Sequence, residues 1–429
     1  MMKLGVLFLI LLMNTGLEQF LIMILIMNFM VILLNYSFNL IYMGFLVDEF
    51  SVILMLLTLW LSFMILIMVF NFKFMSKFFY EKLVFFMAII LVMSFVLKNL
   101  IFFYITFELI LLPVTIMITH WGLNPYRLQA GIYMLFYTVS VSLPMILSMF
   151  LIYFNCGTLI MILISYLKIE FNLISLFLIM GMSVKFPIYI LHLWLPKAHV
   201  QAPVFGSMIL AGILLKLGGY GFLRILPMIL FFNSVFLILM TIWGGFLTAF
   251  LSFRQTDLKM LVAYSSIGHM AMVYVNLIMF SSFSFKGSLS MMLAHGLCSS
   301  GMFFMVDVVY SRMHSRCLVL ISGMFLVIPS LSLCWFLLSI CNMAAPPSFS
   351  LYAEIILLTC GVWHSKWTIM VMVLLSFWGA IFSLYLFLYS NHSYSSSTIS
   401  ICGVTKMEYL ILILHWIPLN LVILNTMMI

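Results

Sequence analysis

The stretch VKFPIYILHLWLPKAHVQAPVFGSMILAGILLKLGGYG, residues 184–221, is mostly apolar but carries lysines and prolines within it. Lys185 follows an almost uninterrupted apolar run, with Pro187 two residues further on, and Lys216 stands in the middle of ILLKLGGYG. An ammonium group among apolar side chains is costly unless it is paired or hydrated. A proline removes a backbone donor and breaks a helix. The stretch therefore predicts buried helices, one of them broken, with charge placed at membrane depth.

The composition around this stretch is that of a membrane protein. The chain has 429 residues, of which 66% are hydrophobic and 7% are charged, and its mean hydropathy is +1.32. A soluble domain carries about 25% charged residues, and a helix that crosses a bilayer needs ~20 apolar residues. We therefore expect an all-α polytopic membrane protein with about 13–14 transmembrane helices. The apolar runs lie at residues 4–13, 17–34, 50–72, 83–97, 100–118, 131–154, 172–191, 204–226, 228–250, 258–280, 287–310, 318–364, 367–390 and 408–426.

The charged and metal-binding residue types exclude several other classes of protein. The net charge is +8, but the basic residues stand singly between apolar runs, so they indicate membrane topology and no nucleic-acid partner. The seven cysteines show no CxxC spacing, so neither a disulfide framework nor an iron–sulfur site is expected. His192 and His199 are seven residues apart, which is not the spacing of a helical metal pair. We expect no metal or cofactor on this chain.

Two apolar runs are interrupted by prolines at corresponding places in the chain. Pro187 and Pro196 interrupt the run that carries Lys185, and Pro346 and Pro347 interrupt the run that leads into Glu354. Paired broken helices are typical of transporters built from inverted repeats, with ion sites at the breaks. We therefore expect two inverted-repeat-like bundles, each with one proline-broken helix. The predicted division is N-terminal helices (1–99), a first antiporter-like bundle (100–226), a second (227–390) and a C-terminal helix (391–429).

Ionisable residues inside the apolar runs are the candidate functional residues. They are Glu108, Lys185, Lys216, His295 and Glu354. Each charge would cost ~2.5 kcal/mol or more at a helix centre unless it is paired or hydrated. A structural ion pair is the alternative explanation for the lysines and glutamates, and His295 can also be neutral and simply hydrogen-bonded. From the residues alone, His269 in SSIGHMAMV favours a structural role.

The run FRQTDLKML contains a further group of charges. Arg254 and Asp257 lie between the runs 228–250 and 258–280, and Lys259 is the second residue of the later run. We expect the three residues to form a charged loop without a specific role in transport.

Proton transfer is the chemistry that suits the buried groups. Burial lowers the proton affinity of a lysine, and a nearby carboxylate raises it again, so a buried lysine with a movable glutamate partner is a switch. A swing of ~3 pKa units corresponds to ~4 kcal/mol. Driving one charge across ~150–200 mV takes ~3.5–4.6 kcal/mol, which is a similar magnitude.

Several motifs resemble one known family. They are FYITFELILLP (103–113), the opening stretch (184–221), RQTDLKMLVAYSSIGHMA (254–271), LAHGLCSSGMFF (293–304) and PPSFSLYAE (346–354). With these motifs the chain closely resembles the subunit 4 family of mitochondrial NADH:ubiquinone oxidoreductase (respiratory complex I), whose members are antiporter-like membrane subunits. The resemblance covers most of residues 100–360. One departure is Ala353, which replaces the glycine that commonly precedes the glutamate of this family.

The resemblance implies a multi-pass protein of the mitochondrial inner membrane. Its partners would be other complex I membrane-arm subunits, including sibling antiporter-like subunits, and membrane lipids. It would couple NADH-to-ubiquinone electron transfer to proton pumping, while NADH, FMN, iron–sulfur clusters and ubiquinone bind to other subunits.

The resemblance also implies roles for individual residues. Glu108 and Lys185 are similar to the coupling pair of the family. Lys216 is similar to its central relay lysine, His295 to its relay histidine and Glu354 to its exit-side acid. His269 also matches a family histidine, and it then joins the expected relay.

Three alternatives remain open from the sequence. A stand-alone cation/proton antiporter subunit would use the same residues. A purely structural spacer in the membrane arm would tolerate neutralisation of all the buried ionisable residues. An independent redox enzyme would need a bound chromophore with a visible absorption spectrum.

Overall fold

The computed structural model describes residues 40–42, 44–71, 77–122, 124–169, 173–229, 235–392 and 403–423. This part of the chain is almost entirely helical, apart from a short antiparallel hairpin of β1 (Leu40–Tyr42) and β2 (Phe45–Val47). Within it, nine helices are long and apolar enough to cross a membrane, or ten if one pair of helices bent by 116° counts as a single span. The expected all-α polytopic fold is confirmed. The runs predicted at 4–13 and 17–34 lie outside the described residues.

The helices fall into successive groups along the chain. The N-terminal helices are α3 (Glu49–Asn71) and α4 (Lys77–Val96). The next group is α5 (Leu100–Leu109), α6 (Leu111–Trp121), α7 (Arg127–Cys156), α8 (Met161–Leu167), α9 (Leu173–Lys185), α10 (Trp194–Gln201), α11 (Val204–Ile209), the π-helix η1 (Leu210–Leu214), α12 (Leu215–Ile225) and the 3-10 turn η2 (Leu226–Met228). The last group is α13 (Val235–Phe253), α14 (Leu258–Ile278), α15 (Ser282–Met313), α16 (Leu318–Ile321), α17 (Met324–Val327), α18 (Pro329–Asn342), α19 (Phe349–His364), α20 (Lys366–Asn391) and α21 (Lys406–Leu421).

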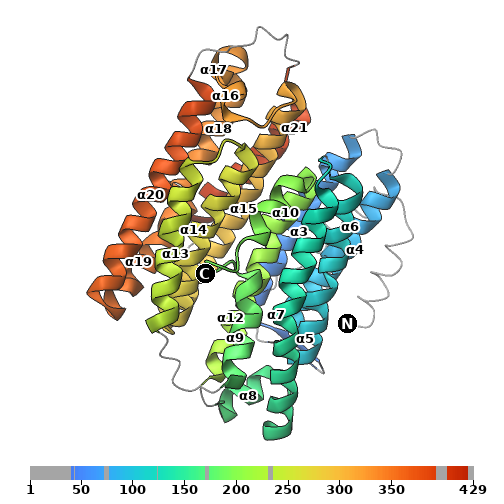
Figure 1. Ribbon diagram of the computed structural model, residues 1–429, viewed down its shortest axis with the longest axis vertical. Coiled ribbons are helices and arrows are strands. Elements are labelled where there is room, and N and C mark those ends of the chain that lie inside the picture. Colours follow the sequence, from blue (N-terminus) through green and yellow to red (C-terminus); the bar gives the residue numbers. More distant parts are fainter. Residues whose placement is uncertain are drawn as a thin grey trace.

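The long helices pack side by side in one bundle. Figure 1 shows α13, α14, α19 and α20 along one side and α4, α5 and α6 along the other, with α3, α10, α12 and α15 between them. Lipid-depth protein must satisfy its backbone groups internally, which is why the spans are helices. The short helices α8 and α10 were not among the predicted runs, because each is too short to produce an apolar window of its own.

The chain leaves the helical conformation at both predicted proline breaks. The helix α9 ends at Lys185, so it is shorter than the predicted run at 172–191. Pro187 cannot continue the helix because it lacks the backbone donor. The freed carbonyl of Val184 accepts a hydrogen bond from the Trp194 indole at 3.0 Å. At the second break, Ser350 Oγ donates to Cys341 O at 2.5 Å. Side chains therefore replace backbone partners at both breaks, as membrane depth requires.

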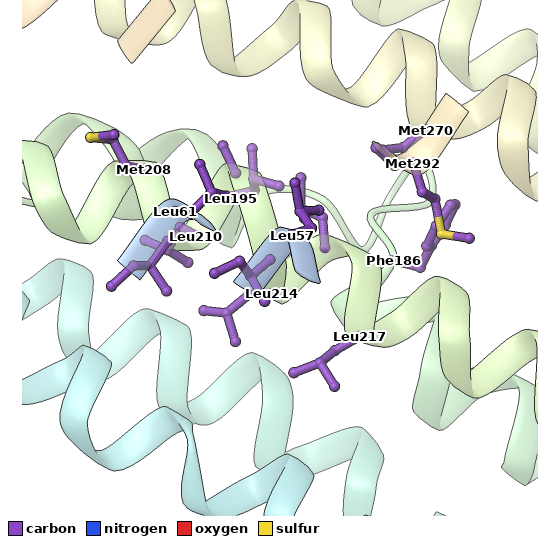
Figure 2. Packing of buried hydrophobic residues seen from close by; sticks show 14 of the residues in the cluster. Leu57, Leu61, Phe186, Leu195, Met208, Leu210, Leu214, Leu217, Met270 and Met292 are labelled. Atoms are coloured by element: carbon purple, nitrogen blue, oxygen red, sulfur yellow. The ribbon is translucent and has the colours of Figure 1, made fainter. Parts of the chain in front are cut away.

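The core is closely packed where α3, η1 and α15 meet. Figure 2 shows Leu57 and Leu61 of α3 beside Leu210 and Leu214 of η1. A Cβ at Gly296 of α15 would lie 2.8 Å from Leu57 Cδ2 and 3.1 Å from Gly212 O. A larger residue there would displace the end of the Leu57 side chain and push Gly212 O away by a few tenths of an ångström. The glycine lets α15 approach η1, and it thereby brings the helix after η1 close to the middle of α15.

Candidate functional site

The first pair of buried charges joins α5 to the end of α9. Lys185 Nζ lies 3.7 Å from Glu108 Oε1, with the lysine side chain 4% exposed and the glutamate side chain 20% exposed. Lys185 Nζ also donates to Phe107 O and lies 3.1 Å from the centre of the Phe107 ring. The proline break fixes this arrangement, because it ends α9 at the lysine and leaves the side chain facing α5. The ammonium group thus has a carboxylate, a carbonyl and a ring face as its partners.

A second pair joins α12 to α15. Lys216 Nζ lies 2.8 Å from His295 Nδ1 and also donates to Ala211 O in η1. Lys216 is completely buried and His295 is nearly so. The π-helix precedes Lys216 by two residues, and π-helical turns are frequent at functional sites. The close approach at Gly296, the residue after His295, brings the two side chains together.

Two further contacts connect His295 to α14 and α14 to α19. The rings of His295 and His269 have their centres 5.8 Å apart. His269 Nδ1 lies 3.8 Å from Glu354 Oε1, and both side chains are largely buried. Lys216, His295, His269 and Glu354 therefore form one continuous row, which we call the buried line. Ala353 lies in regular helix directly before Glu354 and does not interrupt α19.

The Glu108–Lys185 pair lies beside the buried line without touching it. No hydrogen bond or ion pair of the described residues links the two groups. The backbones do meet, since a Cβ at Gly218 of α12 would lie 2.8 Å from Phe186 N and 3.2 Å from Lys185 C. Gly218 is two residues after Lys216, so the break after α9 packs against the turn of α12 that carries the central lysine. The backbone at Lys185 and Phe186 is therefore in close contact with the helix that carries Lys216.

Some polar atoms of these groups have no hydrogen-bond partner. Glu108 Oε1 and His269 Nδ1 are buried, and neither forms a hydrogen bond with the described residues. Buried polar atoms are normally hydrogen-bonded, and in polar sites with enough room they bind water. Both atoms are therefore left with hydrogen-bonding capacity that no described residue uses.

The comparisons with known proteins agree with the motifs. A family model described as "NADH:quinone oxidoreductase/Mrp antiporter, TM" matches residues 97–379, which is more than half of the chain.

The chain belongs to the NADH:quinone oxidoreductase/Mrp antiporter family.

Curated members of this family resemble the chain over nearly its whole length. The "NADH-ubiquinone oxidoreductase chain 4" of Ceratitis capitata is 42% identical over 94% of this chain and 91% of its own length. The chain of the same name in Locusta migratoria is 41% identical over 92% of this chain and 91% of its own length. The chain of the same name in Petromyzon marinus is 35% identical over 79% of this chain and 76% of its own length. The expected resemblance to the subunit 4 family is confirmed.

A chain in a solved structure has the same fold. A chain in the structure named "Respiratory complex I from Thermus thermophilus with bound NADH" matches with a TM-score of 0.75, covering 88% of this chain and 81% of that chain. The two sequences are 19% identical, so this likeness concerns the fold.

The expectation that Lys259 lies in a charged loop was wrong. Lys259 does not lie in a charged loop but in the first turn of α14, where its side chain is fully buried and donates to Ala202 O at 3.0 Å. The loop ends earlier because Asp257 pairs with Cys317 in an antiparallel bridge, so helix begins at Leu258. The burial of Lys259 could not be predicted from hydropathy, because a hydropathy window averages this lysine with the nearby charges of Arg254 and Asp257.

His199 and Asp307 are two further ionisable residues that the sequence did not single out. His199 on α10 is fully buried, and neither ring nitrogen has a hydrogen-bond partner among the described residues. Asp307 lies inside the long apolar helix α15, and that position is the sequence signal that could have identified it. Among the described residues, no group of three or more His, Cys, Asp or Glu side chains is arranged to hold a metal ion.

Proposed function

We propose that this chain is a proton-translocating membrane subunit of NADH:ubiquinone oxidoreductase, multi-pass in the mitochondrial inner membrane. Its membership of the NADH:quinone oxidoreductase/Mrp antiporter family and the names of its relatives support this assignment. Its partners are then the other subunits of the membrane arm. Electron transfer from NADH through FMN and iron–sulfur clusters to ubiquinone takes place on other subunits, and this chain carries the protons.

One observation carries the proposal most strongly. The buried line brings together ionisable side chains from four different helices, α12, α15, α14 and α19, within contacts of 2.8–5.8 Å. Each charge costs ~2.5 kcal/mol or more at membrane depth when it is unpaired, and such groups mark ion and proton pathways. A lysine, two histidines and a glutamate in a row can exchange protons stepwise, because each has a neighbour that can accept or donate one.

The Glu108–Lys185 pair acts as the switch in this proposal. With the carboxylate at 3.7 Å, the ammonium form of Lys185 is stabilised. When Glu108 moves away, the buried ammonium loses its counter-charge and its proton becomes easier to release. Lys185 then passes its proton toward Lys216, and the buried line carries it to Glu354. This order is supported by the packing of Gly218, two residues after Lys216, against the backbone at Lys185, and by the contact of Lys216 with His295.

We further propose that residues 100–226 and 227–390 are related halves, flanked by N-terminal helices (1–99) and a C-terminal helix (391–429). Two antiparallel bridges support this division. Asn99, just before α5, pairs with Ile160, just before α8, and Asp257, just before α14, pairs with Cys317, just before α16. In each half, a carboxylate and a basic side chain bring the helix that follows the first bridge residue together with the broken helix. These contacts are Glu108 with Lys185 and His269 with Glu354.

Two competing functions make different predictions. A stand-alone cation/proton antiporter would use the same residues, and sodium flux through the purified chain without redox partners would favour it. A purely structural spacer would tolerate neutral residues throughout the pair and the buried line.

The direct test replaces the two members of the switch in the assembled complex. We expect Lys185→Met and Glu108→Gln to lower NADH:ubiquinone turnover and proton pumping while the complex still assembles. The matched controls are Lys197→Met and Glu49→Gln, because both side chains are exposed. Wild-type pumping in both switch variants would refute the proposal.

A further inference from the structure

Lys259 is a buried lysine that the proposed pair and line do not use. Its side chain is 0% exposed, and Nζ donates to Ala202 O at 3.0 Å, just past the end of α10. An ammonium group has three donors, so a single carbonyl satisfies only part of it. A lysine this deep needs either a counter-charge or a functional reason to be there.

The counter-charge comes from Asp307 on α15. The carboxylate of Asp307 and the ammonium of Lys259 interact electrostatically, and Asp307 is only partly buried. The other charged groups that act on Asp307 are Arg316, Arg312 and Glu408. Arg312 Nη2 and Glu408 Oε2 form an ion pair at 2.5 Å. These residues lie at the C-terminal end of α15, before α16 and at the start of α21, so they mark one end of the bundle.

His199 connects Lys259 with the buried line. Its ring stacks on Phe303 of α15 with the ring centres 4.5 Å apart, and Phe303 is one turn from Asp307. The positive charges of Lys259 and of Lys216 both act on the His199 ring. Both ring nitrogens are buried without a hydrogen-bond partner among the described residues. His199 is thus close enough to both buried lysines for their charges to act on its ring, and neither ring nitrogen is engaged by another described residue.

We propose that Asp307, Lys259 and His199 form the uptake route by which protons from this end of the bundle reach Lys216 and the buried line. The inference rests on the proposed proton-translocating function and extends it. The Asp307 carboxylate takes one proton from the aqueous phase and passes it to the neutral amine of Lys259. Lys259 gives one proton to a ring nitrogen of His199, and His199 gives one to Lys216. Each group ends the cycle in its starting state, and no bond between heavy atoms changes.

A structural explanation of Lys259 must be separated from this one. Lys259 holds Ala202 O, and Arg316 Nη1 donates to Val200 O at 2.6 Å, so both cations neutralise the C-terminal end of α10. An arginine at 259 would keep the charge and a donor for Ala202 O, but arginine does not release its proton in proteins. Lys259→Arg therefore preserves the structural role and removes the proton transfer.

The experiment compares variants of the whole complex in sealed vesicles. Turnover, proton pumping and the solvent isotope effect in D2O are measured for Lys259→Arg and His199→Gln, with assembly checked on native gels. We expect both variants to assemble and to lose about tenfold or more in pumping-coupled turnover, since loss of a positioned proton-transfer group typically costs 10²–10⁴-fold. We also expect a larger isotope effect, because uptake of a proton becomes rate-limiting. Lys197→Arg, on an exposed lysine, is the control for the substitution itself.

The outcomes separate this route from the function on which it rests. If Lys185→Met abolishes pumping while Lys259→Arg and His199→Gln keep wild-type rates, the uptake route is wrong and the proposed function stands. If Lys185→Met also pumps normally, the function itself is wrong. A loss in Lys259→Arg with an unchanged isotope effect shows a structural role and overturns the route.

Discussion

Lys216 Nζ lies 2.8 Å from His295 Nδ1, although the two residues are 79 positions apart in the chain. A neutral imidazole nitrogen accepts from an ammonium, and two full positive charges at this distance would repel each other strongly. Only one of the two side chains therefore holds the extra proton at a time. The pair can pass a proton between α12 and α15 without any change in its net charge.

Lys216→Arg tests whether this pair must release a proton. Arginine keeps the positive charge but does not deprotonate, so we expect NADH:ubiquinone turnover and pumping to fall about tenfold or more in the assembled complex. Lys197→Arg is the control, because that lysine is exposed. Pumping at the wild-type rate in Lys216→Arg would show that charge alone is needed at this position.

Glu354→Gln tests the far end of the buried line. Glutamine keeps the shape of the side chain but cannot take up or release a proton, so no proton can pass between position 354 and His269, which lies 3.8 Å from Glu354 Oε1. We expect pumping in sealed vesicles to be lost, with assembly unchanged on native gels. Glu49→Gln, on an exposed glutamate, should pump normally. Equal pumping by the two variants would remove Glu354 from the line.

Gly296→Ala tests the close approach that brings Lys216 to His295. The new Cβ would lie 2.8 Å from Leu57 Cδ2 and 3.1 Å from Gly212 O, so the Leu57 side chain must shift and α15 and η1 must separate by a few tenths of an ångström. Overpacking of this kind costs about 1–3 kcal/mol. We expect a lower midpoint of thermal inactivation together with reduced pumping. Gly379→Ala in α20 is the control, since nothing lies within 4 Å of a Cβ there. If Gly296→Ala is as stable as Gly379→Ala, the packing argument fails.

Trp194→Phe tests the support of the first proline break. The indole donates to Val184 O at 3.0 Å, directly before Lys185. Removing the donor leaves a buried carbonyl unsatisfied, which costs about 1–3 kcal/mol. We expect a lower thermal-inactivation midpoint and a change in turnover, because the end of α9 positions Lys185. Trp335→Phe should cost less, as the buried Trp335 indole nitrogen has no hydrogen-bond partner among the described residues. A larger loss in Trp335→Phe than in Trp194→Phe would contradict this account.

Much of the fold could be predicted from the sequence, because lipid imposes a simple rule on the chain. Apolar runs of sufficient length must become helices, and prolines within them must become breaks, so α9 and α19 adjoin breaks at the expected places. The short helices α8 and α10 escaped prediction, since their neighbours and not their own hydropathy hold them in place. Lys259 was misplaced for a related reason, because the pairing of Asp257 with Cys317 decides where the loop ends.

The sequence by itself placed the Glu108–Lys185 pair and the residues of the buried line within apolar runs, and an apolar run must lie at membrane depth. Only the tertiary structure decided which of them are neighbours. Lys216 meets His295, and His269 meets Glu354, through packing of helices that are far apart in the chain. Close approach at glycines such as Gly296 sets those distances, and the spacing of residues along one helix contains no information about its partner. The proton-carrying roles of Glu108, Lys185 and the buried line stay predictions that the variants above test.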